Sequence, residues 1–153
     1  MKILIKHYTE LSTSELYEIL ALRIAVFVVE QNCPYHETDF KDQAAYHLMI
    51  HDNDILVGVS RILPPGLVYN EAAIGRVASL KKMRGKGIGH EIMKASIKFI
   101  NEKWIQSNIR ISAQTYLVKF YEDHGFNLTG KSYLEDDIPH EEMLLVTQNQ
   151  INK

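Results

Sequence analysis

Apolar side chains recur along this chain with two periodicities, one typical of strands and one typical of helices. Asp52-Asn53-Asp54 separates two alternating runs and predicts a hairpin turn between them. The cluster Pro64-Pro65-Gly66 predicts a second turn, since it is too short to separate domains. Strands are expected at residues 2–8, 46–51, 55–63, 73–79, 109–113, 126–133 and 142–147.

The first helix is expected from residue 13 into the late twenties. Ser12 and Glu15 have the spacing of a capping box, and apolar residues then recur at helical spacing. The β-branched run at residues 24–29 weakens the end of this helix. Residues 31–42 contain a proline, aromatic residues and several acids, and are expected to form a loop or a short broken helix.

Two further helices are expected later in the chain. Residues 87–104 have the clearest amphipathic pattern, with apolar side chains on one face. Thr115 is the expected N-cap of the last helix, which runs to His124 and stops at Gly125. Helices interleaved with strands predict one α/β (α+β) domain over residues 1–153, with a mixed sheet and helices on its faces.

Composition and charge exclude several classes of protein. The net charge is -2, which argues against a general nucleic-acid binder because such proteins carry a basic excess. The single cysteine, Cys33, cannot form an intramolecular disulfide and favours a reducing compartment. The longest apolar run, residues 24–29, is far shorter than the roughly 20 residues that span a bilayer, and the N-terminal run is too short for a signal peptide. A cytoplasmic protein with no membrane partner is expected.

A glycine-rich segment joins the strand at 73–79 to the amphipathic helix. It reads Arg84-Gly85-Lys86-Gly87-Ile88-Gly89 and follows Lys81 and Lys82. Glycine permits positive φ and close approach of a ligand, and the following helix offers free N–H groups and the positive end of its dipole. The segment therefore predicts an anion site for a phosphate or pyrophosphate. It is neither a G-x-G-x-x-G fingerprint nor a P-loop, and a glycine-rich connection with solvated lysines is the alternative.

Two motifs resemble the GNAT superfamily of N-acetyltransferases. The segment 84–89 matches the superfamily signature Arg/Gln-x-x-Gly-x-Gly/Ala. The segment 120–126, Phe-Tyr-Glu-Asp-His-Gly-Phe, is similar to its second helical motif, which ends in Tyr-x-x-x-Gly-Phe. The resemblance covers residues 1–147. The segments 26–35 and 133–140, together with Asp39, Asp42 and His47, resemble the ElaA-like branch of the superfamily.

The resemblance implies a centrally splayed mixed sheet and direct transfer of an acetyl group from acetyl-CoA to a primary amine. The strand through residues 77–79 would bind the pantetheine arm through main-chain groups. The main-chain amides of the loop at residues 84–89 would bind the pyrophosphate. Gln114 replaces an Asn of many relatives, and Lys81 replaces a proline. Tyr121 corresponds to the tyrosine that protonates the leaving thiolate. The cofactor-binding residues so implied are Val77, Ala78, Ser79, Arg84, Gly85, Lys86, Gly87, Ile88, Gly89 and Gln114.

The sequence determines the base and the acceptor site less well. Acids that follow the first helix either bind a cationic amine or form a solvated acidic loop. His140, in the expected late loop, is placed with Tyr121 as a catalytic residue, whereas Glu30, Asp39 and His47 are expected to bind the acceptor. Alternatively, a chain of water molecules removes the proton from the amine, as in many relatives, and no single side chain is the base. The candidate bases are Glu30, Glu37, Asp39, His47 and His140, and the acidic cluster consists of Glu30, Glu37, Asp39 and Asp42.

The remaining expectations concern Cys33, metals and partners. Cys33 is expected to be a structural thiol, because no Cys-His-Asp motif can be identified in the sequence. No metal is expected, since His47 and His51 lie four residues apart in a strand pattern, a span of about 13 Å. The partner is a small-molecule or peptide amine, and a homodimer is left open. A non-catalytic acyl-CoA-binding sensor and a nucleotide-phosphate-binding protein are the alternative functions.

Overall fold

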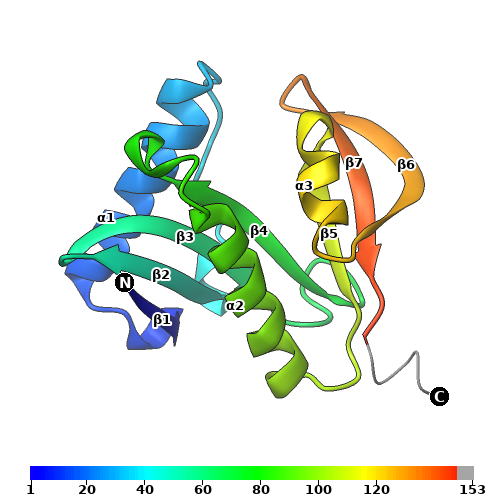
Figure 1. Cartoon of the computed structure of the whole chain (residues 1–153), viewed down its shortest axis with the longest axis horizontal. Coiled ribbons are helices and arrows are strands. Elements are labelled where there is room, and N and C mark those ends of the chain that lie inside the picture. The colour runs from blue at the N-terminus through cyan, green and yellow to red at the C-terminus, as the bar shows by residue number, and fades with distance from the viewer. Residues whose placement is uncertain (148–153) are drawn as a thin grey trace.

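The computed structural model describes residues 1–147 and contains one seven-stranded mixed sheet, which confirms the expected fold class (Figure 1). The strand order across the sheet is β1-β2-β3-β4-β5-β7-β6. All neighbouring strands are antiparallel except β4 and β5, which are parallel. The strands are β1 (Lys2–His7), β2 (Tyr46–Asp52), β3 (Ile55–Leu63), β4 (Ala72–Ser79), β5 (Ile109–Gln114), β6 (Asn127–Glu135) and β7 (Ile138–Leu145).

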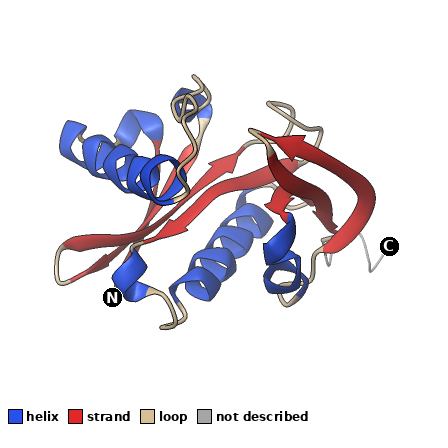
Figure 2. Cartoon of the chain, turned by 90° about the horizontal axis from the view of Figure 1, so that it is seen from above, coloured by secondary structure: helices blue, strands red, loops and turns tan. Residues whose placement is uncertain are grey.

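Helices cover both faces of this sheet. The helix α1 lies on one face, and α2 and α3 lie on the other (Figure 2). Among the described residues, no helix is long and apolar enough to cross a membrane. The α-helices are α1 (Thr13–Ile24), α2 (Ile88–Lys103) and α3 (Val118–Glu122), η2 (Ala25–Glu30) is a π-helix, and η1 (Tyr8–Glu10), η3 (Asp42–Ala44), η4 (Lys81–Met83) and η5 (Thr115–Leu117) are short 3₁₀ turns.

The predicted capping box starts α1. The Ser12 hydroxyl accepts from the Glu15 N–H at 3.0 Å, and the Glu15 carboxylate accepts from the Ser12 N–H at 2.8 Å. The weak β-branched end of this helix widens into η2 instead of stopping, so the helical segment reaches Glu30. Turns of this wide kind are common at functional sites.

The last helix differs from its expected form. Thr115 is not its N-cap, because residues 115–117 form the 3₁₀ turn η5 and α3 begins only at Val118. Short 3₁₀ turns of this kind frequently precede an α-helix. Gly125 does provide the expected stop, with a φ of 94° after the helix.

Close packing fixes the start of α2 over the sheet. A Cβ on Gly58 of β3 would lie 2.9 Å from Ile88 Cγ2 and 3.1 Å from Ile92 Cδ1, so only glycine allows this approach. Ile88 and Ile92 are fully buried with Leu48 and Val57 of the sheet. The glycine-rich segment before α2 is therefore anchored on a rigid core.

The parallel strands β4 and β5 separate soon after they meet. Their pairing is limited to Ala72 with Ile109 and Ala73 with Arg110. Beyond these pairs the rest of β4, residues 74–79, has no partner on its β5 side among the described strands. The sheet is thus splayed near its middle, as the resemblance implies.

Residues 134–141, which were expected to form a loop, instead complete a hairpin. Strand β6 continues to Glu135, and β7 starts at Ile138, which pairs with Glu135. Between them Asp136 and Asp137 have positive φ of 50° and 64°, as in a type I′ turn. His140 consequently lies on a strand, opposite Gln114 of β5.

Candidate active site

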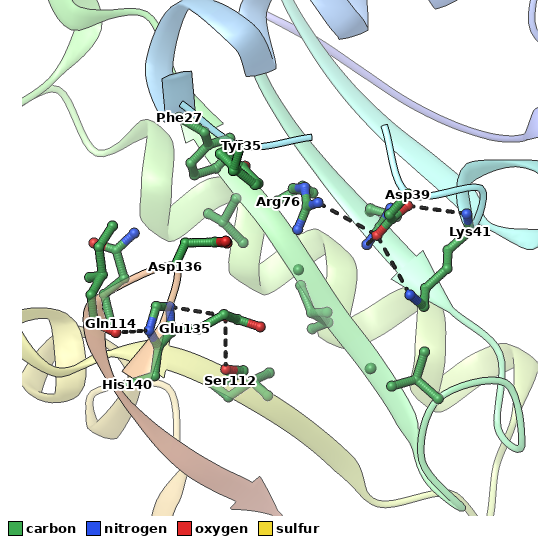
Figure 3. A pocket seen from close by; sticks show the side chains of 18 of the residues that line it. Phe27, Tyr35, Asp39, Lys41, Arg76, Ser112, Gln114, Glu135, Asp136 and His140 are labelled. Carbon is green, nitrogen blue, oxygen red and sulfur yellow. Dashed lines mark hydrogen bonds and ion pairs between the residues drawn. The ribbon is translucent and has the colours of Figure 1, made fainter. Parts of the chain in front are cut away.

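A cavity of about 670 Å³ lies where β4 and β5 separate. Figure 3 shows Arg76, Asp39 and Lys41 on one side of it and Gln114, Glu135 and His140 on the other. The lining includes Phe27 from η2 and Gln31 directly after it, Gly75, Arg76 and Val77 from β4, Ser112 and Gln114 from β5, Leu117 from η5, Tyr121 from α3, and Glu135, Asp136 and His140 from the hairpin.

The open edge of β4 presents main-chain groups to this cavity. The Leu80 N–H donates to the Val57 carbonyl of β3 at 3.0 Å. Because N–H groups alternate between the two edges of a strand, the Ser79 N–H is directed toward the open edge. An extended ligand with its own amides can pair with such an edge as an added strand does.

A β-bulge interrupts β4 at the cavity. Val59 pairs with Ala78, whereas Arg61 pairs with Gly75, so β4 has one residue more than β3 in this interval. Arg76 lies in the bulge with a φ of 51°, a conformation that costs a non-glycine residue about 1–3 kcal/mol. The surrounding contacts must therefore hold Arg76 in place.

The glycine-rich loop has the backbone that an anion site requires. Gly85 and Gly87 have φ of 83° and 81°, and a Cβ on either would meet open space. Gly87 is the N-cap of α2, and no side chain of the described residues caps this end, so the first N–H groups of the helix are available. A Cβ on Gly89 would lie 3.3 Å from the Phe120 ring, which explains the glycine there.

Arg84 ties this loop to the helical segment η2. Its guanidinium forms an ion pair with Glu30 and donates to the Ser79 carbonyl at 3.1 Å. Glu30 therefore lies beside the glycine-rich loop, and it does not line the cavity where an acceptor would enter.

Tyr121 lines the cavity from α3. Its ring packs edge-on against Phe120 and Phe126, with centroids 5.0 and 6.2 Å away. Burial, with a smaller contribution from Tyr116, raises the pKa of Tyr121 to about 12. The phenol therefore stays protonated at neutral pH and can donate a proton.

His140 has a fixed orientation on the opposite wall. Its Nδ1 lies 2.7 Å from the Ile138 carbonyl, which can only accept, so Nδ1 carries a proton. Its Nε2 lies 3.2 Å from a carboxylate oxygen of Glu135. With Nδ1 bonded to the main chain, Nε2 is the ring nitrogen left for other contacts, and the Glu135 carboxylate lies beside it.

Two contacts cross the splay between the segment that follows η2 and the C-terminal part of the fold, at β5 and at the β6–β7 turn. The side-chain amides of Gln31 and Gln114 face each other at 3.4 and 3.5 Å. Cys33 Sγ lies 3.8 Å from the Asp136 carbonyl oxygen. Gln114 therefore lies at the end of β5 where β4 and β5 are apart, and Cys33 lines the cavity beside the hairpin.

The acids after η2 do not form a solvated loop. Glu37 and Asp42 are buried, and each pairs with two arginines. Burial acts to raise the pKa of Asp39, but hydrogen bonds and charge from Arg61 outweigh it and hold the pKa below its ordinary range. The arginines that neutralise these acids were missed from sequence, as was Glu135. These arginines are Arg23, Arg61 and Arg76.

His47 lies behind this acidic segment and does not line the cavity. It is buried, and its Nε2 donates to the Asp42 carbonyl at 3.0 Å. Its Nδ1 has no hydrogen-bond partner among the described residues. Burial lowers the pKa of His47 more than the nearby Asp42 raises it, so folding favours the neutral ring.

We expect His47 to destabilise the fold in acid. Its folded pKa is below the unfolded value, so the unfolded chain binds more protons as the pH falls below about 6.5, with a slope of at most about 1.4 kcal/mol per pH unit. In urea unfolding between pH 7.5 and 5, His47→Gln should show a shallower loss of unfolding free energy than wild type. His51→Gln, on the same strand, is the control, and equal slopes for wild type and His47→Gln would contradict this assignment.

No group of three or more metal-ligating side chains occurs among residues 1–147. His47 and His51 both lie on β2, the strand geometry that was expected.

The sequence and the fold match a known protein family. The GNAT acetyltransferase domain family matches residues 12–147, and the chain therefore belongs to this family. GNAT proteins of this fold use acyl-CoA, so the chain is a member of an acyltransferase family.

Particular relatives identify the branch. The chain is 39% identical to protein ElaA of Escherichia coli K12 over 136 residues, which cover 88% of this chain and 89% of ElaA. The crystal structure of Escherichia coli ElaA has a TM-score of 0.88 at 36% identity, covering 94% of this chain and 98% of that one. An acyl-CoA N-acyltransferase from Pseudomonas aeruginosa has a TM-score of 0.91 at 38% identity, covering 95% and 99%. These similarities confirm the resemblance to the ElaA-like branch.

Proposed function

We propose that the protein is an N-acetyltransferase that transfers an acetyl group directly from acetyl-CoA to a primary amine. One observation carries the proposal: the open edge of β4 leads from the glycine-rich loop into a cavity that contains Tyr121 and His140. The family match supports an acyl-CoA donor, and the acetyl group and the amine are the proposed refinements.

The donor would bind along β4 and at the start of α2. The loop amides of residues 85–89, with Lys86, would bind its pyrophosphate, since the helix dipole and free N–H groups favour an anion. The amides of the pantetheine arm would pair with the open edge of residues 77–79, and Gln114 would contact the arm from the other side of the splay. The thioester then lies at the bulge, between Tyr121 and the hairpin.

The residues around that point supply the chemistry of the transfer. The amine nitrogen attacks the thioester carbonyl, a C–N bond forms and the C–S bond breaks. A main-chain N–H of the β4 bulge stabilises the negative charge on the carbonyl oxygen. Tyr121 donates its proton to the departing thiolate, and Nε2 of His140, directly or through water, takes the proton that leaves the amine.

A CoA-release assay over a panel of primary amines tests the proposal. Wild type should release CoA in the presence of amine, and His140→Gln should reduce kcat by about 100-fold. His51→Gln, outside the cavity, should match wild type. A protein that acetyl-CoA stabilises in a thermal shift assay, but that releases no CoA with any amine, is the non-catalytic sensor instead. Stabilisation by ATP alone would support the nucleotide-binding alternative.

A further inference from the structure

Three arginines and three carboxylates form a closed ring beside the β4 bulge. Arg23 Nε and Arg76 Nε lie 3.0 and 2.6 Å from the two carboxylate oxygens of Glu37. Arg76 Nη2 lies 3.5 Å from Asp39, which also accepts from Arg61 at 2.7 Å. The charges alternate around this part of the ring.

Asp42 completes the ring. One of its carboxylate oxygens lies 2.9 Å from both Arg61 Nη1 and Arg23 Nη1. Every carboxylate of the ring thus contacts two arginines, and every arginine contacts two carboxylates. The ring carries no net charge and leaves none of its three carboxylates unpaired for a cationic acceptor.

The ring joins four separate parts of the fold. Arg23 comes from α1, Arg61 from β3 and Arg76 from β4, whereas the carboxylates come from the segment between η2 and β2. Arg76 is also the residue of the bulge that has a positive φ. Its guanidinium additionally donates to the Glu37 carbonyl at 3.1 Å, so its position is fixed by both side-chain and main-chain atoms of the loop.

We infer that this ring positions the β4 bulge for acyl transfer, with Arg76 as the positioning residue that holds the main-chain groups facing the thioester. The inference rests on the proposed function for its catalytic consequence. A bulge in a strained conformation persists only where its surroundings determine it, and displacement of a reacting group by about 1 Å can cost about 100-fold in rate.

Arg76→Gly is the sharpest variant for this test. Glycine accepts a φ of 51° without strain, so the bulge conformation stays accessible while the connection to the ring is lost. Glu37 and Asp39 each keep one arginine, which avoids an unpaired buried carboxylate. Arg76→Lys keeps the charge without the planar fork, and it serves as a second variant should the first fail to fold.

Lys6→Gln is the matched control. Lys6 on β1 forms an ion pair with Glu15 on α1 at 2.9 Å, so it also connects α1 to the sheet, but it lies outside the ring and the cavity. The control should keep wild-type kcat even where it lowers the melting temperature.

Steady-state kinetics and amide hydrogen exchange provide two readouts. We expect Arg76→Gly to lower kcat by about 100-fold and to change the affinity for acetyl-CoA by no more than about threefold, because the loop before α2 is intact. Asp39→Asn should also lower kcat. The kcat of the double variant should not fall below that of the less active single variant, because both substitutions break the same ring.

Hydrogen exchange of residues 75–79 requires no turnover. In the donor-free protein it should be faster in Arg76→Gly and Asp39→Asn than in wild type or Lys6→Gln. Unchanged exchange in β4, or additive losses of kcat in the double variant, would overturn the inference. Faster exchange in a protein that releases no CoA with any amine would overturn the proposed function and leave the positioning of the bulge supported.

Discussion

Tyr121→Phe is expected to lower kcat by about 100-fold while acetyl-CoA affinity stays within about twofold of wild type. The substitution removes only the hydroxyl that would protonate the thiolate, and it keeps the ring that packs between Phe120 and Phe126. Burial raises the pKa of Tyr121 to about 12. At any pH up to about 11, ionisation of this phenol should therefore leave wild-type kcat unchanged.

CoA release and isothermal titration with acetyl-CoA measure the two quantities. Tyr116→Phe is the matched control, since Tyr116 is exposed and lies in the preceding turn η5. Wild-type kcat in Tyr121→Phe would remove the hydroxyl from the mechanism. An equal loss of affinity and kcat would show that the residue shapes the donor site instead.

Gly87→Val is expected to weaken acetyl-CoA binding by at least about tenfold. Gly87 has a φ of 81° at the N-cap of α2, and a β-branched residue there strains the loop whose amides would bind the pyrophosphate. Isothermal titration with acetyl-CoA and with CoA should show the same loss, because both ligands carry the pyrophosphate.

Gly130→Val provides the control for backbone strain. Gly130 has a φ of 94° in β6, and a Cβ there also meets open space, so the two substitutions impose similar strain at different places. Its affinity for acetyl-CoA should equal that of wild type. Equal losses of affinity in both variants would attribute the effect to global destabilisation and remove the loop from the donor site.

Features that depend on neighbouring residues could be predicted from the sequence. The capping box at Ser12 and the stop at Gly125 need only a few adjacent positions, and both occur in the structure. The glycine-rich loop was recognised for the same reason, because positive φ at Gly85 and Gly87 is a property of the local backbone. Local chemistry therefore predicted the element order and the position of the glycine-rich loop.

Features that depend on distant pairs could not be predicted. Glu37 pairs with Arg76, 39 residues away, and no spacing rule links them. One local feature was also missed: the turn at Asp136-Asp137 lacks the glycine that usually marks a type I′ hairpin. His140 was therefore expected on a loop, although the hairpin places it on β7, opposite Gln114.

The incomplete pairing of β4 and β5 has a consequence for the lifetime of the protein. Only two residue pairs join these strands, so a donor lying along β4 would supply hydrogen bonds that the apo sheet lacks. A ligand that binds only the native state adds about 2.7 kcal/mol of stability at a concentration of 100 Kd. Bound acyl-CoA would then make this protein more resistant to proteolysis than the donor-free form.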